Sequence, residues 1–298
     1  MSGGLSVLEK LTKKVNQEQR DVILVFSAPG CGKTSLAAEF PSPCFILDSR
    51  DQGYADLVRS GLIKNQHEPI EAPDWDSLVE VTKAIADPKT PVDFETVVFE
   101  NLGGYQLHLI EKLINEEVVK TGKDYQAVTE KFNSWNMQGM RSAISPFSDW
   151  FRSVCSITER KNSAGKYMRV VLNGHSCLVK DKNVTGAPGE EFQRVDVDLH
   201  PSLLAVVHRD CGNIGWIRQR PLVIKGANGG VGKALADDIR EIVFQSSANN
   251  TSKNRWGLTE AVSMGKSSKE AFNNLKTAIA NAKARVAKAS QTQTGEGK

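Results

Sequence analysis

The segment Asp21–Phe40 constrains the fold of this chain more than any other stretch. It consists of an apolar run, Val22–Phe26, a glycine-rich turn that ends in Gly32-Lys33-Thr34, and a helix-like continuation from Ser35. A buried strand, a turn and a helix in this order point several backbone N–H groups and the positive end of the helix dipole at one place. The segment therefore predicts a βα unit that binds phosphate groups.

The turn supplies the residue types that suit a nucleoside triphosphate. Gly30 and Gly32 allow the backbone to curl around phosphates without a clash from a Cβ. Lys33 is expected to reach the β- and γ-phosphates, and the Thr34 hydroxyl is expected to ligate Mg²⁺. We therefore expect ATP and Mg²⁺ as ligands, with nucleotide contacts from Ser27, Ala28, Pro29, Gly30, Cys31, Gly32, Lys33, Thr34 and Ser35.

Ser27 stands where a loop of this kind usually begins with glycine. Serine fits this position if its backbone angles are ordinary. The alternative interpretation is a chance glycine-rich turn. The apolar strand before the turn and the helix-like sequence after it favour the nucleotide site.

Composition and cysteine content set the broad class. The chain has 298 residues, is 40% hydrophobic and 24% charged, and is long enough for one large α/β domain or two small ones. No run is long enough to span a bilayer, and the N-terminus lacks the apolar core of a secretory signal. The five cysteines show no metal-like spacing, and their odd number argues against a disulfide framework, so a cytoplasmic protein is expected.

Further apolar segments continue the strand–helix order along the chain. This order predicts a mainly parallel sheet with right-handed crossovers, flanked by helices. Strands are predicted over Pro41–Asp48, Phe94–Asn101, Arg169–His175 and, as the last strand, Ile239–Phe244; helices are predicted over Asp74–Ala86, Tyr105–Val119 and Tyr125–Cys155.

The sequence between these strands is more polar. Ser176–Gln193 is predicted as a long exposed loop, and Leu203–His208 with Asn213–Ile217 as a hairpin. Ala227–Ala234 imitates the phosphate loop, but Ala234 replaces the hydroxyl, so a glycine-rich surface loop is predicted there.

We divide the chain into three parts. Residues 1–20 are predicted as an N-terminal arm, residues 21–258 as the α/β core, and residues 259–298 as a basic C-terminal helix with a disordered tail. The helix is expected over Ser268–Ala289 and the tail over Gln291–Lys298. An apolar stripe along the helix comprises Phe272, Leu275, Ile279 and Val286. Packing of this stripe on the core is favoured over a binding role.

A phosphate loop needs a carboxylate at the end of another parallel strand to hold Mg²⁺, directly or through water. Glu100 closes the strand Thr96–Phe99 and is the natural candidate, although Asp is the usual residue there. A charged strand cap is the alternative role. ATP hydrolysis also needs a group that orients and deprotonates the attacking water, and the candidates after the second strand are Asp48, Arg50 and Asp51.

Two further sites have competing interpretations. His175 at the tip of the fourth strand either senses the γ-phosphate or is a polar strand cap. Lys253 and Arg255 either reach the γ-phosphate of a neighbouring subunit, as an arginine finger does, or form a solvated basic turn.

The chain resembles the phage-type RecA-like P-loop ATPases, in particular the Sak-type single-strand annealing proteins. The resemblance covers roughly residues 20 to 260 and rests on Ser27–Pro41, Cys44–Asp48, Val97–Glu100 and Lys253-Asn-Arg-Trp-Gly-Leu258. It implies a RecA-like ATPase core in which the Glu100 strand is not the immediate neighbour of the loop strand. It also implies a location in the host cytoplasm, if the protein is phage-encoded.

The resemblance further implies partners and roles. ATP would lie between subunits of a ring or filament, with Lys253 and Arg255 acting in trans. The segment after His175 would bind single-stranded DNA, with Lys180 and Lys182 meeting phosphates. A single-stranded-DNA-binding protein is an expected partner.

This chain differs from the family at the position of the water-activating Glu. The matching position is Arg50, and Asp51 follows it. Either Asp51 serves instead, or ATP is hydrolysed slowly, so the ATPase activity itself is left open.

Two other functions compete with DNA recombination. A nucleotide-switched assembly ATPase without a DNA role agrees with the net charge of only +3. A small-molecule kinase agrees with the phosphate loop, but the chain shows no arginine-rich lid.

Overall fold

The computed structural model describes residues 21–50, 52–64, 66–132, 138–182, 191–220, 222–224, 233–235 and 239–295. Within them, nine strands form one sheet in the order β11-β10-β7-β1-β5-β4-β2-β3, with β6 paired to β5. The strands are β1 Val22–Ser27, β2 Pro43–Asp48, β3 Ile70–Ala72, β4 Thr96–Phe99, β5 Arg169–Lys182, β6 Glu191–Val197, β7 Asn213–Gln219, β10 Arg240–Val243 and β11 Val262–Ser263. A separate two-stranded sheet pairs β8 Leu222–Ile224 with β9 Lys233–Leu235.

The strands from β7 to β3 in this order are parallel to one another, whereas β10, β11 and β6 are added antiparallel. This confirms the predicted mainly parallel sheet. Strand β5 lies between β1 and β4, so the Glu100 strand is not next to the loop strand, as the resemblance implied.

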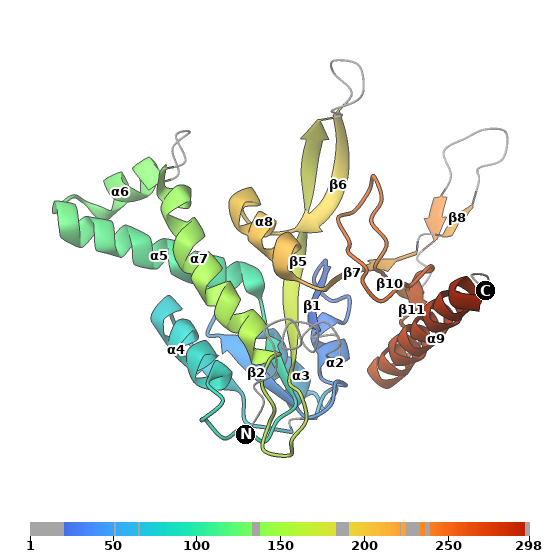
Figure 1. Ribbon diagram of the computed structural model, residues 1–298. Coiled ribbons are helices and arrows are strands. Elements are labelled where there is room, and N and C mark those ends of the chain that lie inside the picture. Colours follow the sequence, from blue (N-terminus) through green and yellow to red (C-terminus); the bar gives the residue numbers. More distant parts are fainter. Residues whose placement is uncertain are drawn as a thin grey trace.

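Helices cover both faces of the sheet (Figure 1). Because successive strand residues point to opposite faces, Leu24 and Phe26 of β1 pack with the core beneath α4, α5, α7 and α8, whereas Ile23 and Val25 pack with α2, α3 and α9. The helices are α2 Lys33–Ala37, α3 Gly53–Arg59, α4 Trp75–Ala86, α5 Leu102–Thr121, α6 Tyr125–Phe132, α7 Gln138–Ile157, α8 Pro201–Asp210 and α9 Ser268–Gly295. No helix in the described part of the chain is long and apolar enough to cross a membrane.

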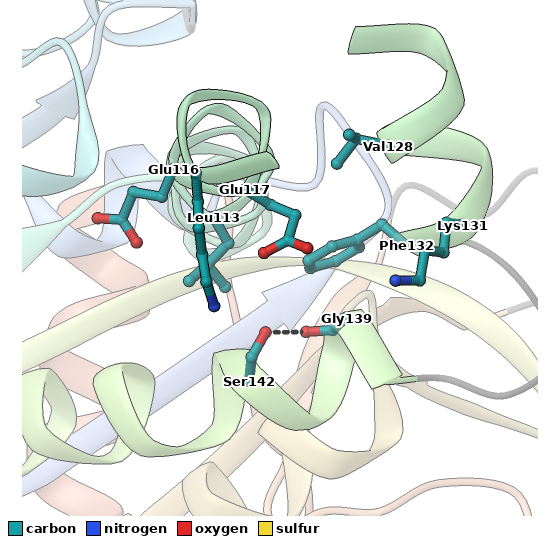
Figure 2. Close-up of a pocket in the computed structure, with 9 residues that line it drawn as sticks. Leu113, Glu116, Glu117, Val128, Lys131, Phe132, Gly139 and Ser142 are labelled. Carbon is teal, nitrogen blue, oxygen red and sulfur yellow. Dashed lines mark hydrogen bonds between the residues drawn. The ribbon is translucent and has the colours of Figure 1, made fainter. Parts of the chain in front are cut away.

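The predicted helix Tyr125–Cys155 is two helices, α6 and α7; residues 133–137 lie outside the described residues. Together with α5 they enclose a cavity of about 330 Å³, which Figure 2 shows. Val128 and Phe132 form its apolar side, and Glu116, Glu117 and Lys131 line it with charge. None of its lining residues belongs to the phosphate loop.

The prediction of a loop over Ser176–Gln193 is wrong. Strand β5 continues past His175 to Lys182 and pairs with β6 in a long antiparallel hairpin that extends away from the sheet (Figure 1). The lysines of this segment suggested a loop, but Cys177, Leu178 and Val179 form regular cross-strand pairs. Residues 183–190 lie outside the described residues.

The predicted hairpin over residues 203–217 is also wrong. Its first half is helix α8, which begins after His200 with Pro201 in the first turn. Leu203, Leu204 and Val207 are buried at helical spacing, and a short apolar run does not distinguish a helix from a strand. Strand β7 is the second half.

Two predicted ends also differ. Strand β11 follows β10, so β10 is not the last strand. Helix α9 continues to Gly295, past Ala289 and into the predicted disordered tail. The N-terminal arm, residues 1–20, and most of the loop Ala227–Ala234 lie outside the described residues.

Candidate nucleotide site

The phosphate loop connects the end of β1 at Ser27 to the start of α2 at Lys33. Gly30 has a φ of 76° and Gly32 a φ of 96°, in the left-handed region that favours glycine. The Gly32 carbonyl accepts the hydrogen bond from the Leu36 N–H at 2.9 Å, which begins the helix. The backbone therefore makes the tight turn that the sequence predicts.

The Lys33 side chain folds back over the loop and is only 7% exposed. Its Nζ lies 3.1 Å from Ser27 Oγ, 3.2 Å from the Ser27 carbonyl oxygen and 3.3 Å from the Ala28 carbonyl oxygen. Ser27 thus fits the first position of the loop and contributes two acceptors there. The ammonium is held inside the concave loop, where phosphate oxygens would replace neutral acceptors with charged ones.

Three side chains from three elements meet beside the loop. The Thr34 hydroxyl donates to Glu100 Oε1 at 2.8 Å, and Asn173 Nδ2 donates to Glu100 Oε2 at 2.7 Å. Glu100 is 5% exposed and Asn173 is 1% exposed. The hydroxyl and the carboxylate are hard oxygen donors, so this pair fits Mg²⁺, held by Thr34 and by Glu100 directly or through water.

Asn173 is a site residue that sequence reasoning missed. It lies in β5 among Val170, Val171 and Leu172, all of which are fully buried. A polar residue inside such a run needs a buried hydrogen-bond partner, and that need was the available signal. Its partner is Glu100, which directly follows β4, the neighbouring strand.

His175 is not at the tip of its strand, because β5 continues to Lys182. It lies in register with Ser27, where the phosphate loop starts. Residues two apart in a strand share a face, so His175 lies on the same face of β5 as Asn173. His175 therefore lies beside the start of the phosphate loop, two residues further along β5 than Asn173, which contacts Glu100.

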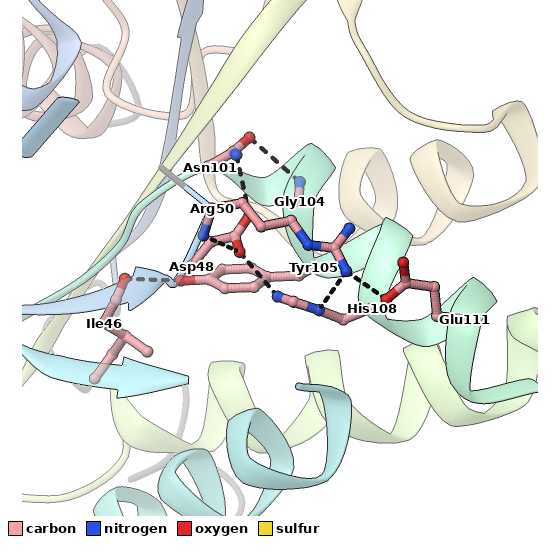
Figure 3. Close-up of polar contacts among 8 residues, drawn as sticks. All are labelled: Ile46, Asp48, Arg50, Asn101, Gly104, Tyr105, His108 and Glu111. Carbon is pink, nitrogen blue, oxygen red and sulfur yellow. Dashed lines mark hydrogen bonds and ion pairs between the residues drawn. The ribbon is translucent and has the colours of Figure 1, made fainter. Parts of the chain in front are cut away.

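Asp48, the last residue of β2, and Arg50 contact residues at the start of α5 and within it (Figure 3). Asp48 is 1% exposed and accepts hydrogen bonds from the Arg50 N–H and from Asn101 Nδ2, at 3.1 and 3.2 Å; His108 Nε2 lies 2.9 Å from Asp48 Oδ1. Asn101 precedes α5 and His108 belongs to it, so Asp48 faces the side of the sheet opposite α2.

Arg50 is directed to the same helix. Its guanidinium approaches His108 Nδ1 at 3.4 Å and forms an ion pair with Glu111. Asp48 and the Arg50 side chain are thus both held by contacts with α5 and the residue before it. Asp51 lies outside the described residues.

The proposed finger residues differ from each other in their surroundings. Lys253 Nζ donates to the carbonyl oxygens of His208 and Arg209 at 2.7 and 3.2 Å, at the C-terminal end of α8. Burial, and the nearby charge of Arg255, lower the pKa of Lys253. The Arg255 side chain is exposed, and its backbone N–H donates to Asn213 Oδ1 at 2.8 Å. Lys253 thus has a structural role within its own chain.

A comparison with known protein families matches part of the chain. Residues 19–144 match the family model described as an AAA domain. The matched segment contains the phosphate loop and Glu100 and ends within α7. A search of curated proteins found no match.

The match indicates a P-loop NTPase-like AAA fold and supports a nucleotide-binding ATPase. Such a family implies nucleotide binding, typically with Mg²⁺.

Proposed function

We propose that the chain is a RecA-like ATPase that binds single-stranded DNA and acts in phage-type recombination or strand annealing. The observation that carries this proposal is the continuity of β5. One strand contains Asn173, which holds Glu100, and also forms the hairpin that extends beyond the sheet (Figure 1). A ligand on the hairpin is thereby connected to the nucleotide site through a single element.

The hairpin surface suits single-stranded DNA. Leu178 and Lys180 lie on one face of the hairpin, where Leu178 is 68% exposed and the Lys180 side chain is exposed. Phe192, which pairs with Asp181, is 36% exposed on the other face. Apolar and aromatic side chains on which bases stack, combined with cations that meet phosphates, are the usual basis of sequence-independent single-strand binding. Lys182 is the last residue of β5, two residues after Lys180; its side chain lies outside the described residues.

The proposal includes assembly with further copies of the chain. ATP would lie at the interface between subunits of a ring or filament, and Arg255 would reach the γ-phosphate of the neighbour. Its exposed side chain supports that role better than the side chain of Lys253 does. A single-stranded-DNA-binding protein is the proposed further partner, and Asp51 the proposed water-activating residue.

The proposal is tested by electrophoretic mobility shift of labelled single-stranded DNA across a salt series, with and without ATP and Mg²⁺. We expect binding that ATP strengthens and that weakens steeply with salt. Absence of binding at low salt would remove the DNA role, and ATP binding without DNA binding would favour an assembly ATPase.

Two charge reversals locate the DNA contact. Lys180→Glu on the hairpin is expected to weaken DNA binding about tenfold or more, because it removes a phosphate contact and adds repulsion. Lys89→Glu is the matched control, since Lys89 is exposed and lies between α4 and β4, at the edge of the sheet opposite the hairpin. Equal loss in both variants would contradict a hairpin site.

A further inference from the structure

Arg240 is a basic residue at the phosphate loop that the functional argument above has not used. It is the first residue of β10, which runs antiparallel to β7. Its N-terminal position in an antiparallel strand therefore places it at the edge where the parallel strands end and the loop begins. The Arg240 carbonyl oxygen accepts a hydrogen bond from the Met264 N–H at 2.8 Å, so β11 also holds its backbone.

The guanidinium of Arg240 lies against the loop. Its Nη1 donates to the Cys31 carbonyl oxygen at 3.3 Å. The same atom lies 3.0 Å from the place that a Cβ on Gly32 would occupy. The guanidinium therefore lies close to the backbone of Gly32, whose left-handed conformation favours glycine.

Within the described residues, the guanidinium meets no carboxylate. The neighbouring Glu241 instead pairs with Arg218, whose Nη2 lies 2.7 Å from Glu241 Oε1. Among the described residues, the hydrogen bond to the Cys31 carbonyl oxygen uses one of the five N–H donors of this guanidinium. A half-buried cation beside a loop shaped for phosphates is a favourable arrangement only when it stabilises negative charge.

The two sides of the loop differ in chemistry. Glu100 and Asn173 come from β4 and β5, on one side of β1, whereas Arg240 comes from β10, beyond β7 on the other side. Thr34 and Glu100 would hold Mg²⁺ on the first side, where the ion would offset the charge of the terminal phosphates. The α-phosphate would then lie toward the second side, where Arg240 is.

We propose that Arg240 binds the α-phosphate end of the nucleotide held by the phosphate loop of the same chain. This inference rests on the nucleotide-binding function. The Cys31 carbonyl orients the guanidinium before the nucleotide arrives, and the phosphate then takes the available N–H groups. A contact at this end is common to ATP and ADP, so it contributes to affinity and not to discrimination between them.

The test measures dissociation constants for Mg-ATP and Mg-ADP by calorimetry, in the wild type and in three variants. Arg240→Gln is expected to weaken both nucleotides by about tenfold or more, the usual loss for one charge-assisted hydrogen bond. Arg240→Lys, which keeps the charge, is expected to lose less. Arg218→Gln is the control, because Arg218 is a similar cation on the adjacent strand and pairs with Glu241.

Several outcomes would overturn the inference. These are wild-type affinity in Arg240→Gln, a loss for ATP without a loss for ADP, equal losses in the Gln and Lys variants, or an equal loss in the Arg218 control. Melting temperatures without nucleotide show whether each variant is folded. If the wild type were folded but bound neither nucleotide, the nucleotide-binding function itself would be wrong.

Discussion

The Thr34 hydroxyl and the Glu100 carboxylate, 66 residues apart in the chain, are joined by a hydrogen bond of 2.8 Å. One belongs to the first turn of the helix after the phosphate loop, and the other follows a strand that is not adjacent to the loop strand. A small metal ion bound by the pair would enter or adjoin this contact, which makes Glu100 the most direct point at which to test it.

Glu100→Gln preserves the size of the side chain but removes its negative charge. We expect ATP to bind with less dependence on Mg²⁺ and any ATP turnover to fall on the order of a hundredfold, because the metal ion that the carboxylate would hold would stabilise the charge of the transition state. Magnesium titrations of ATP binding and a phosphate-release assay measure both effects. Glu95→Gln is the control, since Glu95 pairs with Lys166 at the other end of β4. Unchanged Mg²⁺ dependence would contradict the assignment.

Gly104→Ala tests the packing of α5 on β2. A Cβ at this position would lie 1.8 Å from Asp48 Oδ2, so the buried carboxylate network has to move. We expect a loss of about 1–3 kcal/mol in the free energy of unfolding, as in other overpacked sites. Gly103→Ala is the control and should cost less, because its Cβ would lie 3.3 Å from the Asp198 carbonyl oxygen. Urea unfolding of both variants measures the difference.

Cys31 is expected to react with iodoacetamide faster than the other four cysteines, and ATP is expected to slow that reaction. The thiolate is the reactive form, and burial raises the pKa of Cys44 to about 11 and that of Cys155 to about 12. Burial also raises the pKa of Cys177 and Cys211. Mass spectrometry of labelled peptides gives each rate, and labelling of Cys31 that ignores ATP would argue against phosphates in the loop.

Lys253→Met should destabilise the chain, whereas Arg255→Ala should not. The Lys253 ammonium bonds two carbonyl oxygens at the end of α8, and its loss should cost about 1 kcal/mol. Arg255→Ala keeps the backbone bond to Asn213 and should change stability by less than about 0.5 kcal/mol. Thermal unfolding compares them. A Lys253 variant of unchanged stability that no longer assembles would instead favour a role between subunits.

Asp196, at the base of the hairpin, is fully buried and should make stability depend on acidic pH. Burial raises the pKa of Asp196, but the nearby His208 and Thr251 side chains and the hydrogen bond from the Val197 N–H, 2.8 Å from Oδ1, leave that pKa below its ordinary value. Its carboxylate therefore stabilises the fold above the unfolded pKa of about 3.9, and this contribution is lost as the pH falls through the lower folded pKa.

Asp196→Asn should accordingly cost about 1–3 kcal/mol at pH 7 and less near about pH 3. Urea unfolding at the two pH values measures this. The exposed Asp198→Asn is the control and should show little effect at either. A cost for Asp196→Asn that does not change with pH would contradict an ionised role.

The sequence predicted the part of the fold that repeats a strong local pattern. Strands β1, β2 and β4 are continuous apolar runs, and their order around the loop predicted a mainly parallel sheet. The hairpin was missed because its stability comes from pairing β5 with β6, which local composition does not reveal. Helix α8 was missed because the apolar run Leu203–Val207 is too short to distinguish the residue spacing of a helix from that of a strand.

The candidate site shows the same limit. Lys33, Thr34 and Glu100 follow from motif spacing, and the structure brings Thr34 and Glu100 into contact. Asn173 and Arg240 reach the site only through the order of strands in the sheet, which places β5 beside β4 and β10 beyond β7. No single segment of sequence contains that order.

Strand β5 has a mechanical consequence. From Asn173 to Lys180 the strand advances about 23 Å, at roughly 3.3 Å per residue, and paired backbone stiffens its outer half. A tilt of about 3° at Asn173 would swing the far end by roughly 1 Å over that length. A small rotation of β5 near Asn173, which contacts the Glu100 carboxylate, would therefore be accompanied by a larger displacement of the hairpin.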